Sequence, residues 1–568
     1  MDRSSQDGEG KKNVTEVTTF PVPFALGEIK TNITINTNSP SKPSKEQIIN
    51  QAIQFHLKGN IPEASKYYQY CINQGFNDHR IFSNYGAISQ GLGKLKEAEL
   101  SISKAIELNP DFAEAHSNLG NVLKDLGKLQ EAELAQRKAI ELNPDFAEAH
   151  YNLGCILSDL GNFQDSELSL QKAIELKPDF SEAYYNLGNV LSNLGNLQDS
   201  ELSLRKAVQI KPNFAQAHNN LGRVLNDLGR IEEAESCFRQ AIDLQPDDED
   251  AHTNLSLIEL LKGNYESGFE NYEYRLNKNN TTIFHLDAQL KQIGNKKLKK
   301  TEKLLLVTEQ GLGDTLQYMR YIPYLRNQGL KISFCAQTKL HSLIQSSGID
   351  QNPLTPEDAS EVSEGKWIPL LSLPRYLKVS PDNPIISEPY IFSTNELKKK
   401  WKNILSKEKR PIIGINWQGN PNMEKTYQGR SIPLETFATL AKNNNFKLLS
   451  LQKGFGSEQL DHCSFKNKFV QCQQQIDSTW DFLENAAIIE NCDLIITCDT
   501  SIAHLAGGMG RKVWLLLRDI PFWTWGLEGS STFWYPSMRL FRQKERHNWQ
   551  EVMERVSSKL NKELEERI

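Results

Sequence analysis

A 34-residue period is the sequence feature that most constrains how this chain can fold. Proline and glycine both recur at this interval, at Pro110, Pro144, Pro178, Pro212 and Pro246 and at Gly59, Gly93, Gly127, Gly161, Gly195, Gly229 and Gly263. A fixed period of this length is typical of repeat proteins, in which each unit buries its apolar face against its neighbours. The period therefore predicts a solenoid over residues 46–276.

Each unit has the pattern of two antiparallel helices. In AEAHSNLGNVLKDLGKLQEAELAQRKAIELNP (113–144), small residues at 120, 132 and 139 let the two helices approach closely. A glycine ends the first helix and a proline stops the second. The unit resembles the tetratricopeptide repeat at Leu119, Gly120, Ala132, Ala139 and Pro144. This resemblance implies an α superhelix of about seven helix pairs, whose groove is a surface available to partners.

An asparagine lies two residues before the helix-packing glycine of most units, or before the serine that replaces it in the last: Asn84, Asn118, Asn152, Asn186, Asn220 and Asn254. Two interpretations stay open. The residue was copied by duplication, or it forms a ladder that pairs with the backbone of an extended peptide, because an amide both donates and accepts hydrogen bonds. The repeats resemble those of O-linked N-acetylglucosamine transferases, which implies a protein or peptide acceptor in the groove.

The pattern changes after a polar connector, residues 277–302, for which we expect a short helix. Six short apolar runs separated by helix-like stretches predict buried parallel strands at 303–307, 330–336, 411–416, 446–451, 493–497 and 512–517. We therefore expect a doubly wound α/β region in two lobes, 303–395 and 396–568, with a ligand in the cleft between them. Residues 1–45, rich in serine, asparagine and lysine, are expected to be disordered.

The first predicted strand runs into TEQGLGDTLQYMRYIPYL. Gly311 and Gly313 permit a tight turn through which backbone N–H groups can approach a ligand. Position 316 is leucine, so the third glycine of the dinucleotide fingerprint is absent, and no P-loop lysine follows. Asp314 has two interpretations: it caps the next helix, or it takes a proton from an acceptor hydroxyl as a general base.

The loop after the strand at 411–416 contains Asn416, Gln418, Lys425 and Arg430. Cations here would stabilise a departing diphosphate, because developing negative charge is best met by fixed donors and cations. Solvated surface charge is the alternative interpretation of both cations. The SLQKG segment (450–454) is another strand end that would meet a nucleotide.

The strand at 493–497 runs into the polar corner CDTSIAH. Asp499, Thr500 and Ser501 are good helix caps, and His504 follows one turn later. A helix start at the carboxyl edge of a parallel sheet is also where an anion binds. Capping and anion binding are therefore both expected functions of this corner.

Four motifs together, GLGDTLQYMRYIP, GINWQGN…GRSIPL, SLQKG and CDTSIAHLAGGMGRKVW, resemble in the same order those of heptosyltransferase-like glycosyltransferases of the GT-B fold, which has two Rossmann-like lobes. The resemblance implies sugar transfer from a nucleoside-diphosphate donor, with inversion and without an essential metal. It implies Asp314 as general base. It also implies a donor diphosphate site formed by Gly311, Gly313, Arg430, Asp499, Thr500, Ser501 and His504, while Lys425 has no secure counterpart.

Composition excludes several other classes. A net charge of −6 over 568 residues gives no argument for nucleic acid or an anionic membrane. Eight scattered cysteines include no C-x-x-C pair and no zinc spacing, so we expect no metal and a reducing, cytoplasmic location. No run of 18 apolar residues predicts a transmembrane segment, and no cofactor is expected beyond the nucleotide-sugar substrate.

The leading hypothesis is a glycosyltransferase whose repeats recruit the acceptor. A non-catalytic scaffold with a degenerate glycosyltransferase-like domain is the alternative from another class. A nucleotide-sugar epimerase of similar two-lobed fold is the third hypothesis, for which we would expect more paired carboxylates and histidines in the cleft.

Overall fold

The computed structural model describes residues 43–277, 290–293, 300–309, 311–385, 389–408, 411–421, 429–443 and 445–566. Residues 1–42 of the expected disordered segment, most of the connector and Lys425 lie outside these residues. The chain divides after Pro246 into two compact units.

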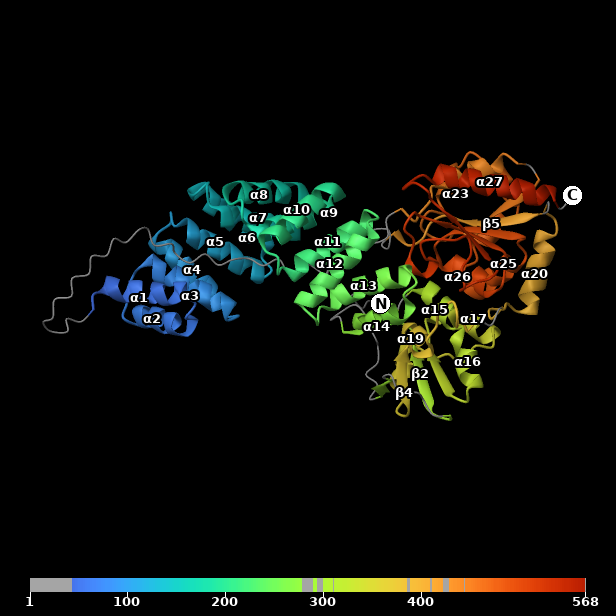
Figure 1. The fold of residues 1–568 in the computed structure, drawn as a ribbon, viewed down its shortest axis with the longest axis horizontal. Coiled ribbons are helices and arrows are strands. Elements are labelled where there is room, and N and C mark those ends of the chain that lie inside the picture. The colour runs from blue at the N-terminus through green and yellow to red at the C-terminus, as the bar shows by residue number, and fades with distance from the viewer. Residues whose placement is uncertain are drawn as a thin grey trace, which may run out of the picture. The chain divides into compact units, whose positions relative to one another are not determined.

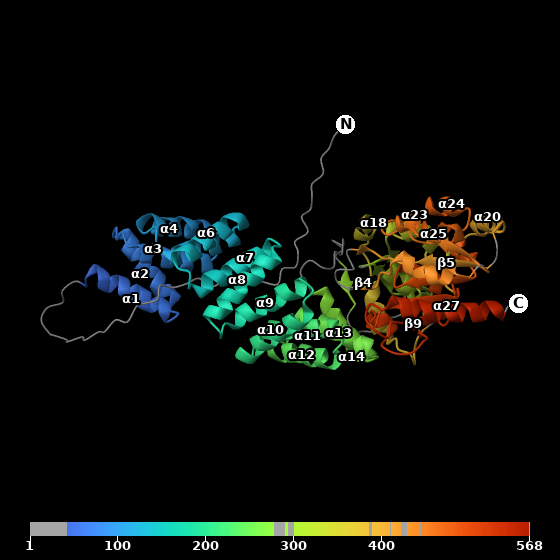
Figure 2. The same ribbon diagram turned by 90° about the horizontal axis from the view of Figure 1, so that it is seen from above.

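The first unit is a series of antiparallel helix pairs, which follow one another from blue to green in Figures 1 and 2. Its described helices are α1 (Lys45–Leu57), α2 (Ile61–Asn73), α3 (His79–Gly91), α4 (Leu95–Leu108), α5 (Ala113–Asp125), α6 (Leu129–Leu142), α7 (Ala147–Asp159), α8 (Phe163–Leu176), α9 (Ser181–Asn193), α10 (Leu197–Ile210), α11 (Ala215–Asp227) and α12 (Ile231–Leu244). The predicted repeat of two helices is confirmed.

Two sets of glycines explain why the pairs form. The glycines spaced 34 residues apart lie between the helices of a pair with positive φ, from +72° at Gly59 to +86° at Gly263, a conformation that favours glycine. The other set lets the helices touch. A Cβ atom on Gly154 would lie 2.6 Å from Leu170 Cγ, and one on Gly188 would lie 2.6 Å from Leu204 Cγ.

The second unit begins with one more helix pair, α13 (Glu249–Leu261) and α14 (Tyr265–Tyr272), followed by the 3₁₀ turn η1 (Glu273–Leu276). This pair packs on the α/β region. Tyr265 meets Phe533 edge to face at 5.4 Å between ring centroids, and Phe269 meets Trp523 at 5.7 Å. The last helix pair of the repeats is therefore structurally part of the α/β unit.

The first sheet has the strand order β1-β4-β2-β3, and all its pairs are parallel. Its strands are β1 (Lys291–Gln292), β2 (Lys303–Val307), β3 (Lys331–Cys335) and β4 (Lys366–Pro369). Its described helices are α15 (Leu312–Tyr318), α16 (Tyr321–Asn327), α17 (His341–Ser346), α18 (Pro356–Ser360) and α19 (Leu373–Leu377). The described part of the connector contributes strand β1, and the rest of the segment in which we expect a short helix lies outside the described residues.

The second sheet has the order β6-β5-β7-β8-β9, again with every pair parallel. Its strands are β5 (Ile412–Asn416), β6 (Lys447–Ser450), β7 (Leu494–Cys498), β8 (Val513–Leu517) and β9 (Met538–Arg542). Helices α20 (Asn395–Leu405), α25 (Phe482–Glu490), α26 (Ser501–Gly508) and α27 (Trp549–Glu565) surround it (Figure 1). Strands β5, β7 and β8 are buried along their whole length, because helices cover both faces.

Candidate functional site

The glycine corner (residues 311–314) and the polar corner (residues 499–504) lie against each other at the carboxyl ends of their strands. Helix α15 follows β2 and helix α26 follows β7. A Cβ atom on Gly313 would lie 3.1 Å from His504 Cδ2 and 3.6 Å from the Cα atom of Ser501. A side chain at 313 would therefore push the two corners apart, which gives this glycine a packing reason.

Asp314 is a helix cap and an unusual acid at once. Its Oδ2 accepts a hydrogen bond from the Gly311 N–H (3.1 Å), as the residue three positions into α15. Burial is the main cause that raises the pKa of this carboxyl from 3.8 to about 7; the Gly311 hydrogen bond lowers the pKa, and the charges of Asp499 and Glu309 raise it. A carboxyl with this pKa is matched to proton transfer near neutral pH.

Asp499 follows β7, and the groups around it have opposite effects on its pKa. Burial raises the pKa of Asp499, while the Trp525 side chain and the guanidinium groups of Arg430 and Arg518 act in the opposite direction. Arg430 is therefore close enough to the polar corner for its charge to lower the pKa of Asp499. Its guanidinium lies over Gly419, where a Cβ atom would be 2.7 Å from Nη2.

Thr500 stands at the N-cap of α26, but its side chain does not cap the helix. The hydroxyl instead donates to Asn416 Oδ1 (2.8 Å), and Asn416 Nδ2 donates to Gln452 Oε1 (2.8 Å). These bonds connect the ends of β7, β5 and β6. The expectation that Thr500 caps the turn is wrong, because its hydroxyl is used across the sheet. The backbone N–H groups at the start of α26 thus donate no hydrogen bond to the Thr500 hydroxyl.

His504 is buried and stays neutral. Its Nδ1 lies 2.9 Å from the Tyr535 hydroxyl, and its ring stacks on Trp525 at 5.3 Å. Burial and the nearby Arg320 guanidinium lower the pKa of His504 to about 3. It can therefore offer one hydrogen bond to a ligand, but not the positive charge that would make it an electrostatic partner for a diphosphate.

The SLQKG turn carries groups that the sequence did not single out. Burial lowers the pKa of Lys453 to about 8. Two large aromatic side chains beside it are exposed, Phe455 by 63% and Trp480 by 68%. A Cβ atom on Gly454 would lie 3.8 Å from the Trp480 ring. An exposed tryptophan at a strand-end turn is the signal that could have drawn attention to this surface.

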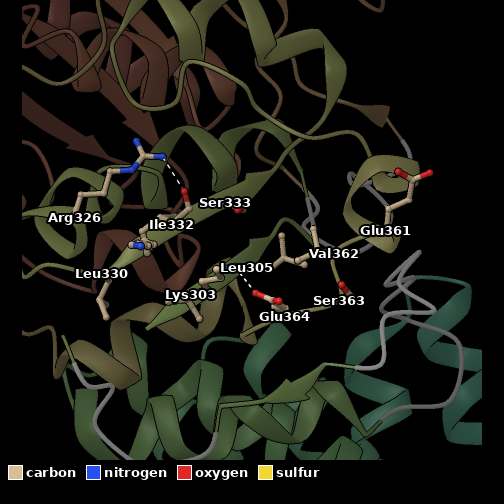
Figure 3. A pocket seen from close by; sticks show the side chains of 12 residues that line it. Lys303, Leu305, Arg326, Leu330, Ile332, Ser333, Glu361, Val362, Ser363 and Glu364 are labelled. Atoms are coloured by element: carbon tan, nitrogen blue, oxygen red, sulfur yellow. Dashed lines mark hydrogen bonds and ion pairs between the residues drawn. The ribbon is translucent and has the colours of Figure 1, made fainter. Parts of the chain in front are cut away.

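A cavity of about 780 Å³ lies elsewhere, at the amino ends of β2 and β3 (Figure 3). Two of its cations are already paired: Lys303 with Glu364, and Arg326 with Asp350 at 2.7 Å. Ligands of parallel α/β sheets bind at the carboxyl ends of strands, so this cavity is at the wrong edge for the residues described above. Within the described ranges, no group of three or more His, Cys, Asp and Glu side chains is arranged to hold a metal ion.

The asparagine series lies inside the repeats. The side chains of Asn84, Asn118, Asn152, Asn186 and Asn220 are all buried. Most donate an amide hydrogen bond to the preceding unit: Asn118 to Ser83 (3.2 Å), Asn152 to Ser117 (3.4 Å), Asn186 to Tyr151 (2.9 Å) and Asn220 to Tyr185 (3.1 Å). The ladder therefore has a role in joining neighbouring units, and its use by a peptide stays a prediction.

Comparison with known families identifies the repeats. Models described as tetratricopeptide repeat or TPR repeat match residues 92–127, 120–161, 147–180, 169–201 and 215–248. Residues 45–276 therefore form tetratricopeptide repeats, and residues 290–566 contain the two parallel sheets of an α/β region. Among the described helices, none combines the length and the apolar character needed to cross a membrane.

Several solved structures are similar to part of the chain. YrrB, a TPR protein with an unusual peptide-binding site, is 26% identical over 33% of this chain and 97% of its own, with a TM-score of 0.29. MamA is 27% identical over 28% of this chain and 94% of its own (TM-score 0.27). MamA from Desulfovibrio magneticus RS-1 is 21% identical over 30% and 96% (TM-score 0.28). No curated protein matches the chain.

Proposed function

We propose that the chain is a cytoplasmic, inverting, metal-independent glycosyltransferase of the GT-B type, which takes its sugar from a nucleoside-diphosphate donor. The observation that carries the proposal is the pair of corners. Asp314, an acid with a pKa of about 7, lies in the glycine corner, which packs against the start of α26. A general base thereby lies close to a set of backbone donors that suit an anionic leaving group.

In the proposed reaction the Asp314 carboxylate takes the proton of an acceptor hydroxyl. The acceptor oxygen then attacks the anomeric carbon, and the bond between that carbon and the diphosphate oxygen breaks on the opposite face. The bonding electrons leave with the nucleoside diphosphate. The proton ends on Asp314, and its pKa near 7 allows the residue to release it to solvent at neutral pH.

The departing diphosphate needs fixed donors around its new charge. The N–H groups of Ser501 and the residue after it start α26, and the Thr500 side chain is bonded to Asn416 and leaves them available to a ligand. The Arg430 guanidinium supplies positive charge next to the polar corner. His504, which is neutral, would donate or accept a single hydrogen bond.

The nucleoside would lie over the SLQKG turn. Trp480 and Phe455 offer exposed aromatic faces, on which a base can stack, and Lys453 lies two residues before Phe455 in the sequence. Gln452 links this turn to the polar corner, because it accepts a hydrogen bond from Asn416, the residue that holds Thr500. One ligand could then contact the turn through its base and the polar corner through its diphosphate.

The tetratricopeptide repeats would bind the acceptor or a protein that presents it. The support for this part of the proposal is the resemblance of the repeats to those of O-linked N-acetylglucosamine transferases. The buried asparagines join neighbouring units, and the side-chain oxygens of Asn152 and Asn186 are themselves buried.

A thermal-shift panel tests the proposal. Nucleoside diphosphates and nucleotide sugars are added to the full-length protein, because a ligand that binds only the folded state raises the melting temperature. We expect one nucleoside diphosphate to stabilise the wild type and Asp314→Asn equally, and only the wild type to transfer sugar. No shift with any nucleotide would favour the scaffold, and nucleotide-sugar conversion without an acceptor would favour the epimerase.

A further inference from the structure

Arg275 ties the last repeat to the first sheet. It lies in η1, and its side chain is only 5% exposed. Its Nη2 donates to Glu309 Oε1 (2.7 Å) and to Ser372 Oγ (3.0 Å), while Nη1 lies 3.0 Å from Glu273 Oε1. Glu309 follows β2 by two residues, just before the glycine corner. One guanidinium group therefore connects the repeats to the strand end that carries Asp314.

Glu309 is a fully buried carboxylate with an incomplete set of partners. Its Oε1 also accepts the Leu371 N–H (3.2 Å), whereas no hydrogen bond from the described residues reaches its buried Oε2. Burial raises the pKa of Glu309, and the Arg275 guanidinium is the main group that lowers it. Burying a charge is costly unless it is paired, so Glu309 depends on Arg275 to remain ionised and ordered.

We propose that Arg275 and Glu309 are positioning residues of the catalytic centre, through which the last tetratricopeptide repeat fixes the backbone and the electrostatic environment of the glycine corner. This inference rests on the proposed function for its effect on catalysis. Its structural part, the tie between η1 and the glycine corner, stands on the contacts alone.

The charges that face Asp314 come from several elements. Asp499 faces it from the end of β7 and Glu309 from the end of β2, and both raise its pKa. His504 of α26 lies beside Gly313, and Tyr318 lies on the same helix as Asp314. Burial is the main cause of the raised pKa of Asp314, and Glu309 is one of two acids whose charges add to it.

The first test compares Arg275→Met with Arg275→Lys and Arg375→Met in the full chain. Arg375 is the matched control, because it makes ion pairs across the same contact, with Glu270 at 3.1 Å and Glu273 at 3.5 Å. We expect Arg275→Met to lower kcat by about tenfold or more, because small misplacements at a reacting centre are costly, with KM for the donor within about twofold. Arg275→Lys should restore part of kcat, and Arg375→Met should leave it unchanged.

Hydrogen exchange of the peptide covering residues 311–319 supplies a readout that needs no activity. We expect faster exchange in Arg275→Met and wild-type exchange in Arg375→Met. Equal effects of the two substitutions on exchange and kcat would overturn the proposal, because the loss of either arginine would then have the same consequence and Arg275 would have no special role. The exchange result tests the contact between η1 and the glycine corner even if no nucleotide binds. In that case the proposed function fails, and the structural part of the inference is still tested.

Glu309→Gln tests the electrostatic part. Glutamine keeps the carbonyl that accepts hydrogen bonds from Arg275 and Leu371 but removes the charge. Because a nearby negative charge raises the pKa of an acid, its removal should move the ascending limb of the kcat/KM pH profile to lower pH. The matched control is Glu273→Gln, at the other carboxylate of Arg275, which should leave the limb in place. A limb that stays fixed in Glu309→Gln would contradict this part of the proposal.

Discussion

Replacing Asp314 with asparagine is expected to stop turnover and, at the same time, to stabilise the α/β half at alkaline pH. The pKa of Asp314 rises from 3.8 to about 7 in the folded protein. An acid with a raised pKa favours folding most below its unfolded-state pKa, and this contribution is lost as the pH rises to the folded-state pKa. Above about pH 7 the ionised carboxylate therefore destabilises the native state, and asparagine removes that cost.

The size of the effect follows from the pKa difference. About three pH units at about 1.4 kcal/mol each set a ceiling near 4 kcal/mol. Asp314 is half-buried, so solvent screens part of this, and we expect about 1–2 kcal/mol. Asparagine keeps a carbonyl oxygen for the Gly311 N–H, which lies 3.1 Å from the wild-type carboxylate, so the helix cap is retained.

Urea unfolding followed by tryptophan fluorescence reports the free energy of unfolding of the α/β half, because all nine tryptophans lie between residues 367 and 549. The free energy of unfolding of Asp314→Asn, minus that of the wild type, should rise from pH 4 to pH 7 and level off near pH 8. Asp358→Asn is the matched control at the same position of α18, where Oδ2 accepts the Thr355 N–H (3.1 Å). Hydrogen bonds lower the pKa of Asp358, so its substitution should destabilise as the pH rises above 4. A flat difference for Asp314→Asn would refute the reasoning.

Three further substitutions test other parts of the molecule. Gly188→Ala should destabilise the repeats by about 1–3 kcal/mol in circular dichroism melts, because its Cβ would meet the side chain of α10 at 2.6 Å; Gly91→Ala, with nothing within 4 Å, should not. Asn186→Leu should cost about 1 kcal/mol by the same measurement, since it removes a buried hydrogen bond between units. Arg430→Gln should weaken nucleoside-diphosphate binding about tenfold in calorimetry, because a charge-assisted contact is lost, and an unchanged affinity would remove Arg430 from the site.

The repeats and most strands could be predicted because their causes are local. A glycine with φ near +80° and a proline every 34 residues mark the repeats without any tertiary information. Strands β2, β5, β7 and β8 are continuous apolar runs, which are typical of central parallel strands. Strands β4 and β9 were missed, because β4 begins with the half-buried Lys366 and edge strand β9 contains the exposed Arg539.

The candidate site was predictable in position but not in chemistry. Strand ends and glycine turns placed Asp314 and His504 at sheet edges, and the structure brings their corners together. The lowered pKa of His504 comes from burial and from Arg320, which is 184 positions away in the sequence and lies between α15 and α16 beside the other sheet. No spacing rule predicts such a neighbour, because the two segments meet only through tertiary packing.

The polar corner shows why residue type alone could not decide between capping and ligand binding. Thr500 has the extended N-cap backbone, with φ −143° and ψ 174°, yet its hydroxyl bonds Asn416 on the neighbouring strand. A threonine that capped α26 would occupy the donors that an anion needs, since the same few N–H groups serve both purposes. Asn416→Ala would release the Thr500 hydroxyl to cap the helix. We therefore expect this substitution, which removes no charge, to weaken nucleoside-diphosphate binding in the thermal-shift panel while leaving the pH dependence set by Asp314 unchanged.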